Sequence, residues 1–203
     1  VLFRAAHHSQ SLEFELMKRN IAYEYRGGMR FFERSHIKDA ISCARLFENI
    51  TDEMAWIRIL KLFPGIGPAT ALKIAHRAMG AANVAEVLAA AIPAPGRAAM
   101  GWQTCQDLLS VLDDVKEKPA AFIRRLVTHQ GYQDYVNANF EDARERLDDL
   151  EEFAFFAEQS QNMQEFLSSV SLTDSFSVKD QPVDGKVILS TIHQAKGLEW
   201  DQV

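Results

Sequence analysis

The chain has 203 residues, of which 47% are hydrophobic and 25% charged. This composition is ordinary for a globular protein with enough apolar material for one large core or two smaller ones. No apolar run approaches the roughly 20 residues that span a bilayer, and the first residues lack the basic and apolar regions of a secretory signal. We therefore expect a cytoplasmic protein without a membrane partner.

The formal net charge of −6 argues at first sight against a nucleic-acid partner, but the charge is unevenly distributed. Residues 1–80 contain 12 Lys and Arg against 8 Asp and Glu, whereas residues 81–180 contain 8 against 17. A basic front and an acidic middle are compatible with one surface that faces DNA and one that faces away.

Two cysteines, Cys43 and Cys105, stand in apolar helical contexts and predict buried free thiols in a reducing compartment. No spacing of Cys and His residues predicts a metal site. The histidines other than His193 are expected at surface or junction positions. The aromatic residues Trp56, Trp102 and Phe153–Phe156 fall on helical stripes and are expected in the core.

The first part of the chain has the pattern of a strand, a helix and a second strand. Val1–Ala5 is a short apolar run, His8–Arg19 has helical periodicity, and Ile21–Tyr25 is again typical of a strand. A strand, a helix and a strand joined by short links form a βαβ-like unit, so we expect the two strands to lie parallel in one sheet.

From Ser35 to about Ser169 nearly every segment has helical periodicity, with Thr51-Asp52-Glu53 as a helix start. Ser171–Gly185 has the composition of a loop, and Lys186–Thr191 of a buried strand. The expected fold is mainly α with a small α/β part, in which a helical domain is inserted into a sheet. The individual helices are predicted at Ala82–Ala91, Gln103–Val115, Pro119–Gln130, Phe140–Gln159 and Met163–Val170.

Polar and small residues follow the last strand, at the end where α/β sheets bind their ligands. Gly197 allows a close backbone approach, Lys196 can meet a phosphate, and Glu199 can accept a hydrogen bond from a sugar hydroxyl. The residues alone leave open that this segment is only a polar turn between a strand and a helix.

The stretch Thr191–Trp200 reads Thr-Ile-His-Gln-Ala-Lys-Gly-Leu-Glu-Trp. It resembles motif V of superfamily 1 helicases of the UvrD/PcrA/Rep type. The resemblance implies that Thr191 and His193 face single-stranded DNA. It also implies that Gly197 and Glu199 lie near the nucleotide, with Glu199 reaching the ribose.

Two further segments resemble the same family. Gly27–Ala40, which reads Gly-Gly-Met-Arg-Phe-Phe-Glu-Arg-Ser-His-Ile-Lys-Asp-Ala, matches a motif between the second motor domain and its insertion, with His36 where Glu is usual. We expect Phe31 and Phe32 in the core and Lys38-Asp39 in a structural ion pair. At the start of the chain, Arg4 matches an arginine that meets the DNA strand, and Ala6 stands where Asn is usual.

The segment Phe63–Ala71, Phe-Pro-Gly-Ile-Gly-Pro-Ala-Thr-Ala, has the pattern of a helix-hairpin-helix turn. Its two glycines permit a tight turn, and the helix that follows offers N–H groups and a positive dipole end to a phosphate. In the family that the chain resembles, such a turn touches duplex DNA ahead of the fork; an ordinary turn between two helices is the alternative. The candidate duplex-binding residues are Gly65, Ile66, Gly67, Ala69, Thr70 and Lys73, with Lys61 and Arg77 as further phosphate contacts.

The resemblance implies part of a RecA-like motor domain at residues 1–32 and 181–203, with an inserted helical subdomain at 33–180. The parent enzyme would be an ATP-dependent 3′–5′ DNA helicase of repair or replication, with Mg²⁺ as cofactor. Its expected partners are single-stranded DNA, duplex DNA and repair or replication proteins. No Gly-x-x-x-x-Gly-Lys-Thr loop is present, so no complete catalytic site and no bound ATP are expected in this chain.

Two alternatives remain open from the residues. One is a helix-hairpin-helix module that binds duplex DNA without a motor. The other is a protein-interaction scaffold built on the acidic helical block.

Overall fold

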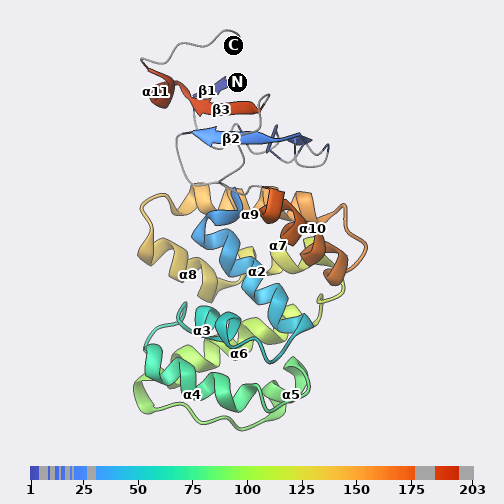
Figure 1. Ribbon diagram of the computed structural model, residues 1–203. Coiled ribbons are helices and arrows are strands. Elements are labelled where there is room, and N and C mark those ends of the chain that lie inside the picture. Colours follow the sequence, from blue (N-terminus) through green and yellow to red (C-terminus); the bar gives the residue numbers. More distant parts are fainter. Residues whose placement is uncertain are drawn as a thin grey trace. The chain divides into compact units, whose positions relative to one another are not determined.

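The computed structural model describes residues 1–4, 9, 12, 13, 15, 16, 19, 21–26, 31–176 and 186–196. The chain divides into two compact units (Figure 1). One contains Val1–Arg34 and Ser168–Val203, and the other contains Ser35–Leu167. The described elements are mostly helices with one small parallel sheet, so the predicted fold class is confirmed.

The first unit contains a three-stranded sheet with the order β1-β3-β2. Strands β1 (Leu2–Phe3) and β2 (Tyr23–Arg26) both run parallel to β3 (Val187–Thr191). The strands at the start of the chain therefore share one parallel sheet, as predicted, but the strand from the end of the chain lies between them.

A small apolar core supports this sheet. Phe3, Leu16 and Leu189 are buried together, and Leu12 packs against them from the helical stretch between the strands. The following 3₁₀ turn, η2 (Phe31–Glu33), buries both phenylalanines, whose rings meet edge to face at a centroid distance of 5.3 Å. The prediction that Phe31 and Phe32 belong to the core is confirmed.

The second unit is built from helices that follow one another with short links (Figure 1). The helices are α2 (Ser35–Glu48), α3 (Glu53–Leu60), α4 (Pro68–Ala78), α5 (Val84–Ala89), α6 (Ala99–Asp113), α7 (Pro119–Thr128), α8 (Gln130–Asn139) and α9 (Ala143–Ala157). Helix α10 (Met163–Phe176) begins in this unit, and its residues from Ser168 belong to the first unit. Short 3₁₀ helix η3 (Gly96–Ala98) precedes α6, and α11 (Ile192–Ala195) follows β3 in the first unit.

Local sequence signals account for several helix starts. The Asp52 carboxylate accepts a hydrogen bond from the Ala55 N–H at 3.0 Å and caps α3, in the predicted Thr51-Asp52-Glu53 segment. Asn83 caps α5 in the same way, while the Glu86 carboxylate accepts from the Ala82 N–H. The arrangement resembles a capping box, but Glu86 bonds to the residue before the cap rather than to the cap residue Asn83 itself.

The core of the second unit contains the two tryptophans and the two cysteines predicted to be buried. Trp56 and Trp102 are buried, and each indole N–H donates to a backbone carbonyl, of Ile50 at 2.8 Å and Ile92 at 3.0 Å. Cys43 and Cys105 are buried free thiols, as predicted. Burial raises the pKa of both thiols well above its ordinary value, so both stay protonated at neutral pH.

Three details of the prediction were wrong. The loop predicted from Ser171 starts later, because α10 continues to Phe176. The segment of α8 is a separate helix that the sequence did not single out. Phe155 is 62% exposed rather than in the core. It lies two residues after buried Phe153, and residues with that spacing point to different sides of a helix.

None of the described helices is long and apolar enough to cross a membrane. Nor do the described side chains bring three His, Cys, Asp or Glu residues together as metal ligands.

Candidate nucleic-acid interface

The turn between α3 and α4 is held in place by its apolar side chains. Phe63 and Ile66 are 2% and 6% exposed, so the turn is anchored in the core of the helical unit. Gly65 has a φ angle of +77°, which an L side chain rarely adopts. Gly67 is the N-cap of α4, and Pro68 occupies its first turn, where a missing N–H costs nothing.

This geometry leaves backbone donors open at the start of α4. The N–H groups of Thr70 and Ala71 both donate to the Gly67 carbonyl, at 3.0 and 2.9 Å. In the part of the chain that the structure describes, the N–H groups of Gly65, Gly67 and Ala69 have no acceptor. Outward N–H groups at the positive end of a helix dipole form a site for an anion such as a phosphate.

Of the other residues predicted here, Thr70 is half-buried and Lys73 is exposed. Lys61 and Lys73 form no ion pair among the described residues, so both ammonium groups are available to an anion. Arg77 instead donates to the Pro93 carbonyl at 3.3 Å. The side chain of Ile66 faces the core, which leaves only its backbone for an outside contact.

A second cluster of polar side chains lies at the carboxyl end of the sheet in the first unit. Phe3 pairs with Thr191, so Arg4 and Ile192 follow directly from adjacent parallel strands. Arg4, His193 and Lys196 are exposed there. The structure thus brings the predicted residues Arg4, Thr191 and His193 to one edge of the sheet, which is where α/β folds bind ligands. Gly197 and Glu199 lie outside the described residues.

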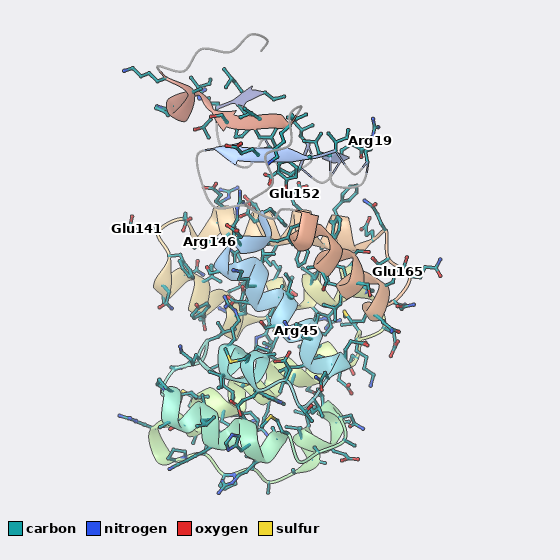
Figure 2. The ribbon with its side chains drawn as sticks, viewed as in Figure 1. Arg19, Arg45, Glu141, Arg146, Glu152 and Glu165 are labelled. Carbon is teal, nitrogen blue, oxygen red and sulfur yellow. The ribbon has the colours of Figure 1, made fainter. Side chains whose placement is uncertain are left out.

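His36, which stands at the start of α2, is buried and has two partners on α9 that the sequence did not predict. Its Nε2 atom lies 2.8 Å from Oδ2 of Asp149 on α9. Its Nδ1 atom lies 3.1 Å from Nη1 of Arg146, also on α9 and labelled in Figure 2. Because a guanidinium only donates, Nδ1 accepts and Nε2–H donates to Asp149. A junction role for His36 was expected, but a contact across 113 positions leaves no local sequence signal.

Arg146 is the hub of this contact. Its Nε donates to Asp142 at 2.7 Å, its Nη1 also reaches Ser35 Oγ at 3.1 Å, and its guanidinium carbon lies 3.9 Å from the centre of the Phe140 ring. The hydrogen bond from Arg146 lowers the pKa of the Asp142 carboxyl. One arginine thus joins the beginning of α9 to the beginning of α2.

The predicted ion pair of Lys38-Asp39 is corrected by the structure, because Asp39 pairs with Arg58 of α3 and not with Lys38. Arg58 Nε donates to Asp39 Oδ1 at 2.7 Å, and Arg58 Nη2 donates to the Ser35 carbonyl at 2.9 Å. Lys38 is exposed. Burial raises the pKa of the Asp39 carboxyl, although Arg58 opposes the shift. The ion pair between Asp39 and Arg58 is structural, because it joins α2 to α3.

Comparison with known proteins identifies the family of this chain. The profile of the UvrD-like helicase C-terminal domain matches residues 1–91 and 104–203. The chain belongs to the UvrD-like helicase C-terminal domain family. The resemblance found in the motifs is therefore confirmed over nearly the whole chain.

The curated relatives that the chain matches are named as DNA helicases, in agreement with this family. DNA helicase II of Escherichia coli is 31% identical and that of Haemophilus influenzae 30% identical, each over 100% of this chain. ATP-dependent DNA helicase PcrA of Staphylococcus epidermidis is 30% identical over 98% of the chain. The chain spans only 29–30% of the length of these three relatives.

Proposed function

We propose that this chain is part of an ATP-dependent DNA helicase that moves 3′ to 5′ along single-stranded DNA and separates the duplex ahead of it. The observation that carries this proposal is the family match across residues 1–91 and 104–203, together with relatives named as DNA helicases. Repair or replication proteins as partners, and a cytoplasmic location, stay predictions.

In this proposal residues 1–32 and 181–203 belong to a RecA-like motor domain and residues 33–180 to its inserted helical subdomain. The parallel sheet formed by strands from both ends of the chain supports the division. Arg4, Thr191 and His193 would contact single-stranded DNA from the carboxyl edge of that sheet. An exposed guanidinium and imidazole suit a phosphate backbone.

The nucleotide would bind beside the same edge in the whole protein. Lys196, exposed just after α11, would meet a phosphate, with Gly197 and Glu199 next to it in the sequence. When bound, ATP with Mg²⁺ would supply the free energy for movement along the strand. The residues of this chain would provide one side of that site.

The helical unit would contact duplex DNA through the turn at Gly65–Thr70. Its open N–H groups, the dipole of α4 and the unpaired ammonium group of Lys73 would all attract phosphate without reading the base sequence. Such a contact suits a helicase, which must hold a duplex of any sequence.

The proposal is tested on the whole protein that contains this chain. With ATP and Mg²⁺ it should displace a strand from a duplex with a 3′ single-stranded tail, and not from one with only a 5′ tail. Arg4→Gln should weaken the stimulation of ATP hydrolysis by single-stranded DNA. Arg19→Gln is the matched control, because Arg19 is an exposed arginine of the same unit (Figure 2) whose side chain pairs with Glu15. Unwinding from the 5′ tail, or no unwinding, would contradict the proposal.

A further inference from the structure

Basic residues gather in the part of the chain around the turn. Residues 61–106 contain four Lys and Arg and one Asp or Glu, whereas the whole chain has 22 against 28. The four cations are Lys61, Lys73, Arg77 and Arg97. Arg97 lies in the segment 92–103 that the family profile does not match.

Arg97 is brought to the turn by a close approach of two backbone segments. A Cβ added at Gly65 would overlap the carbonyl oxygen of Arg97, and a Cβ added at Gly101 would overlap the carbonyl oxygen of Pro64. The contact is reciprocal, since each segment contributes one glycine and one carbonyl. The 3₁₀ turn η3 therefore lies directly against the turn that begins α4.

The segment that carries Arg97 is fixed from several sides. Ala98 is fully buried, the Trp102 indole N–H holds the Ile92 carbonyl at 3.0 Å, and Arg77 donates to the Pro93 carbonyl. These contacts attach the segment to α6 and to α4. The position of the Arg97 backbone beside Gly65 is thus set by the fold.

The side chain of Arg97 faces outward without a partner. It is exposed, and within the described residues it forms no hydrogen bond or ion pair. Other arginines of the helical unit are matched with carboxylates: Arg45 with Asp52, Arg58 with Asp39, Arg124 with Glu158, and Arg146 with Asp142. The Arg97 backbone lies against Gly65, so its exposed guanidinium can add a positive charge to the anion site at the turn.

We propose that Arg97 is a second phosphate contact of the duplex-binding turn, so that two helix-entry turns rather than one hold the DNA backbone. The inference rests on the proposed duplex contact at Gly65–Thr70. Successive phosphates of one strand are separated by about 3.4 Å along the duplex axis. A phosphate at the α4 turn therefore has neighbours within reach of the Arg97 guanidinium, which can bind one through two parallel hydrogen bonds.

The test measures binding of the whole chain to a blunt duplex by fluorescence anisotropy over a series of KCl concentrations. Arg97→Gln is compared with the unchanged protein and with Arg125→Gln. Arg125 is an exposed arginine of α7 that also forms no side-chain pair among the described residues, so the control changes the net charge equally. Arg97→Gln should weaken binding about tenfold at low salt and reduce the slope of log Kd against log [KCl] by about 1. Arg125→Gln should leave both unchanged.

The outcomes separate this inference from the function on which it rests. If the unchanged protein binds duplex and Arg97→Gln binds with the same affinity and slope, the role of Arg97 is wrong while the turn keeps its proposed function. If Arg125→Gln weakens binding as much as Arg97→Gln, the effect is one of net charge and the local contact is also wrong. If the unchanged protein does not bind duplex at low salt, the duplex contact itself fails.

Discussion

His36 Nε2 lies 2.8 Å from Asp149 Oδ2, and both side chains are only 2–4% exposed. This pair joins the first turn of α2 to α9, and Arg146 completes it by donating to the other ring nitrogen of His36. The family that the chain resembles usually has Glu at position 36. In this chain His36 stands there, and its Nε2–H donates to the buried Asp149 carboxylate on α9.

Asp149→Ala should strongly destabilise the helical unit. The change would leave the Nε2–H of His36 buried without an acceptor, and an unsatisfied buried donor lowers the free energy of unfolding by about 1–3 kcal/mol. Asp148→Ala is the matched control, because Asp148 is its exposed neighbour on α9 and should change stability by less than about 0.5 kcal/mol. Urea unfolding measures both, and equal losses would mean that the pair has no structural role.

Gly65→Ala should destabilise the protein, whereas Gly67→Ala should not. Gly65 has φ of +77° and no room for a Cβ beside the Arg97 carbonyl. A side chain there should therefore lower the free energy of unfolding by about 1–3 kcal/mol. Gly67 has φ of −82°, and a Cβ added there would have no other heavy atom within 4 Å. Thermal unfolding compares the two variants, and similar melting temperatures would contradict the described geometry of the turn.

His129 should make the protein less stable as the pH falls. Burial lowers its pKa below the ordinary value of 6.5, although Asp107 and Asp134 oppose the shift. Below that value the unfolded chain takes up a proton more readily than the folded chain, so the proton favours unfolding. The stability contributed by neutral His129 is therefore present above the unfolded pKa and is lost as the pH falls toward the folded pKa.

The measurement for His129 is the change in melting temperature between about pH 7.5 and about pH 5.5, a range that includes the unperturbed His pKa. His129→Gln should show a smaller loss than the unchanged protein over this range. An identical loss in both proteins would mean that another group causes the acid sensitivity.

Features set by neighbouring residues could be predicted from the sequence. The cap at Asp52, the turn of Phe63–Ala71 and the start of α4 at Pro68 depend on residues that are close in the chain. The strands at both ends and the helices between them follow from the spacing of apolar residues. The motifs near Gly27 and Thr191 led to the family because several residue types recur there together.

Features set by distant residues could not be predicted. The central place of β3 depends on a strand that pairs with residues almost the whole chain away. The partners of His36 lie 110 and 113 positions from it. The approach of Arg97 to Gly65 likewise depends on how α3, α4 and α6 pack, because Arg97 lies 32 positions after Gly65.

The central claim, that the turn before α4 binds duplex DNA, is tested most directly by Gly67→Leu. The open space around Gly67 lets a leucine side chain fit without disturbing the core, but it would stand in front of the free N–H groups. Ala82→Leu, at another exposed position of the helical unit, is the control for added apolar surface. The measured quantity is the affinity of the chain for a blunt duplex at low salt, with the melting temperature recorded for each variant. The account predicts a loss of at least about tenfold for Gly67→Leu, the size expected when charge-assisted hydrogen bonds are lost, with a nearly unchanged melting temperature and normal binding by Ala82→Leu. A folded Gly67→Leu variant that binds duplex as tightly as the unchanged protein would contradict it.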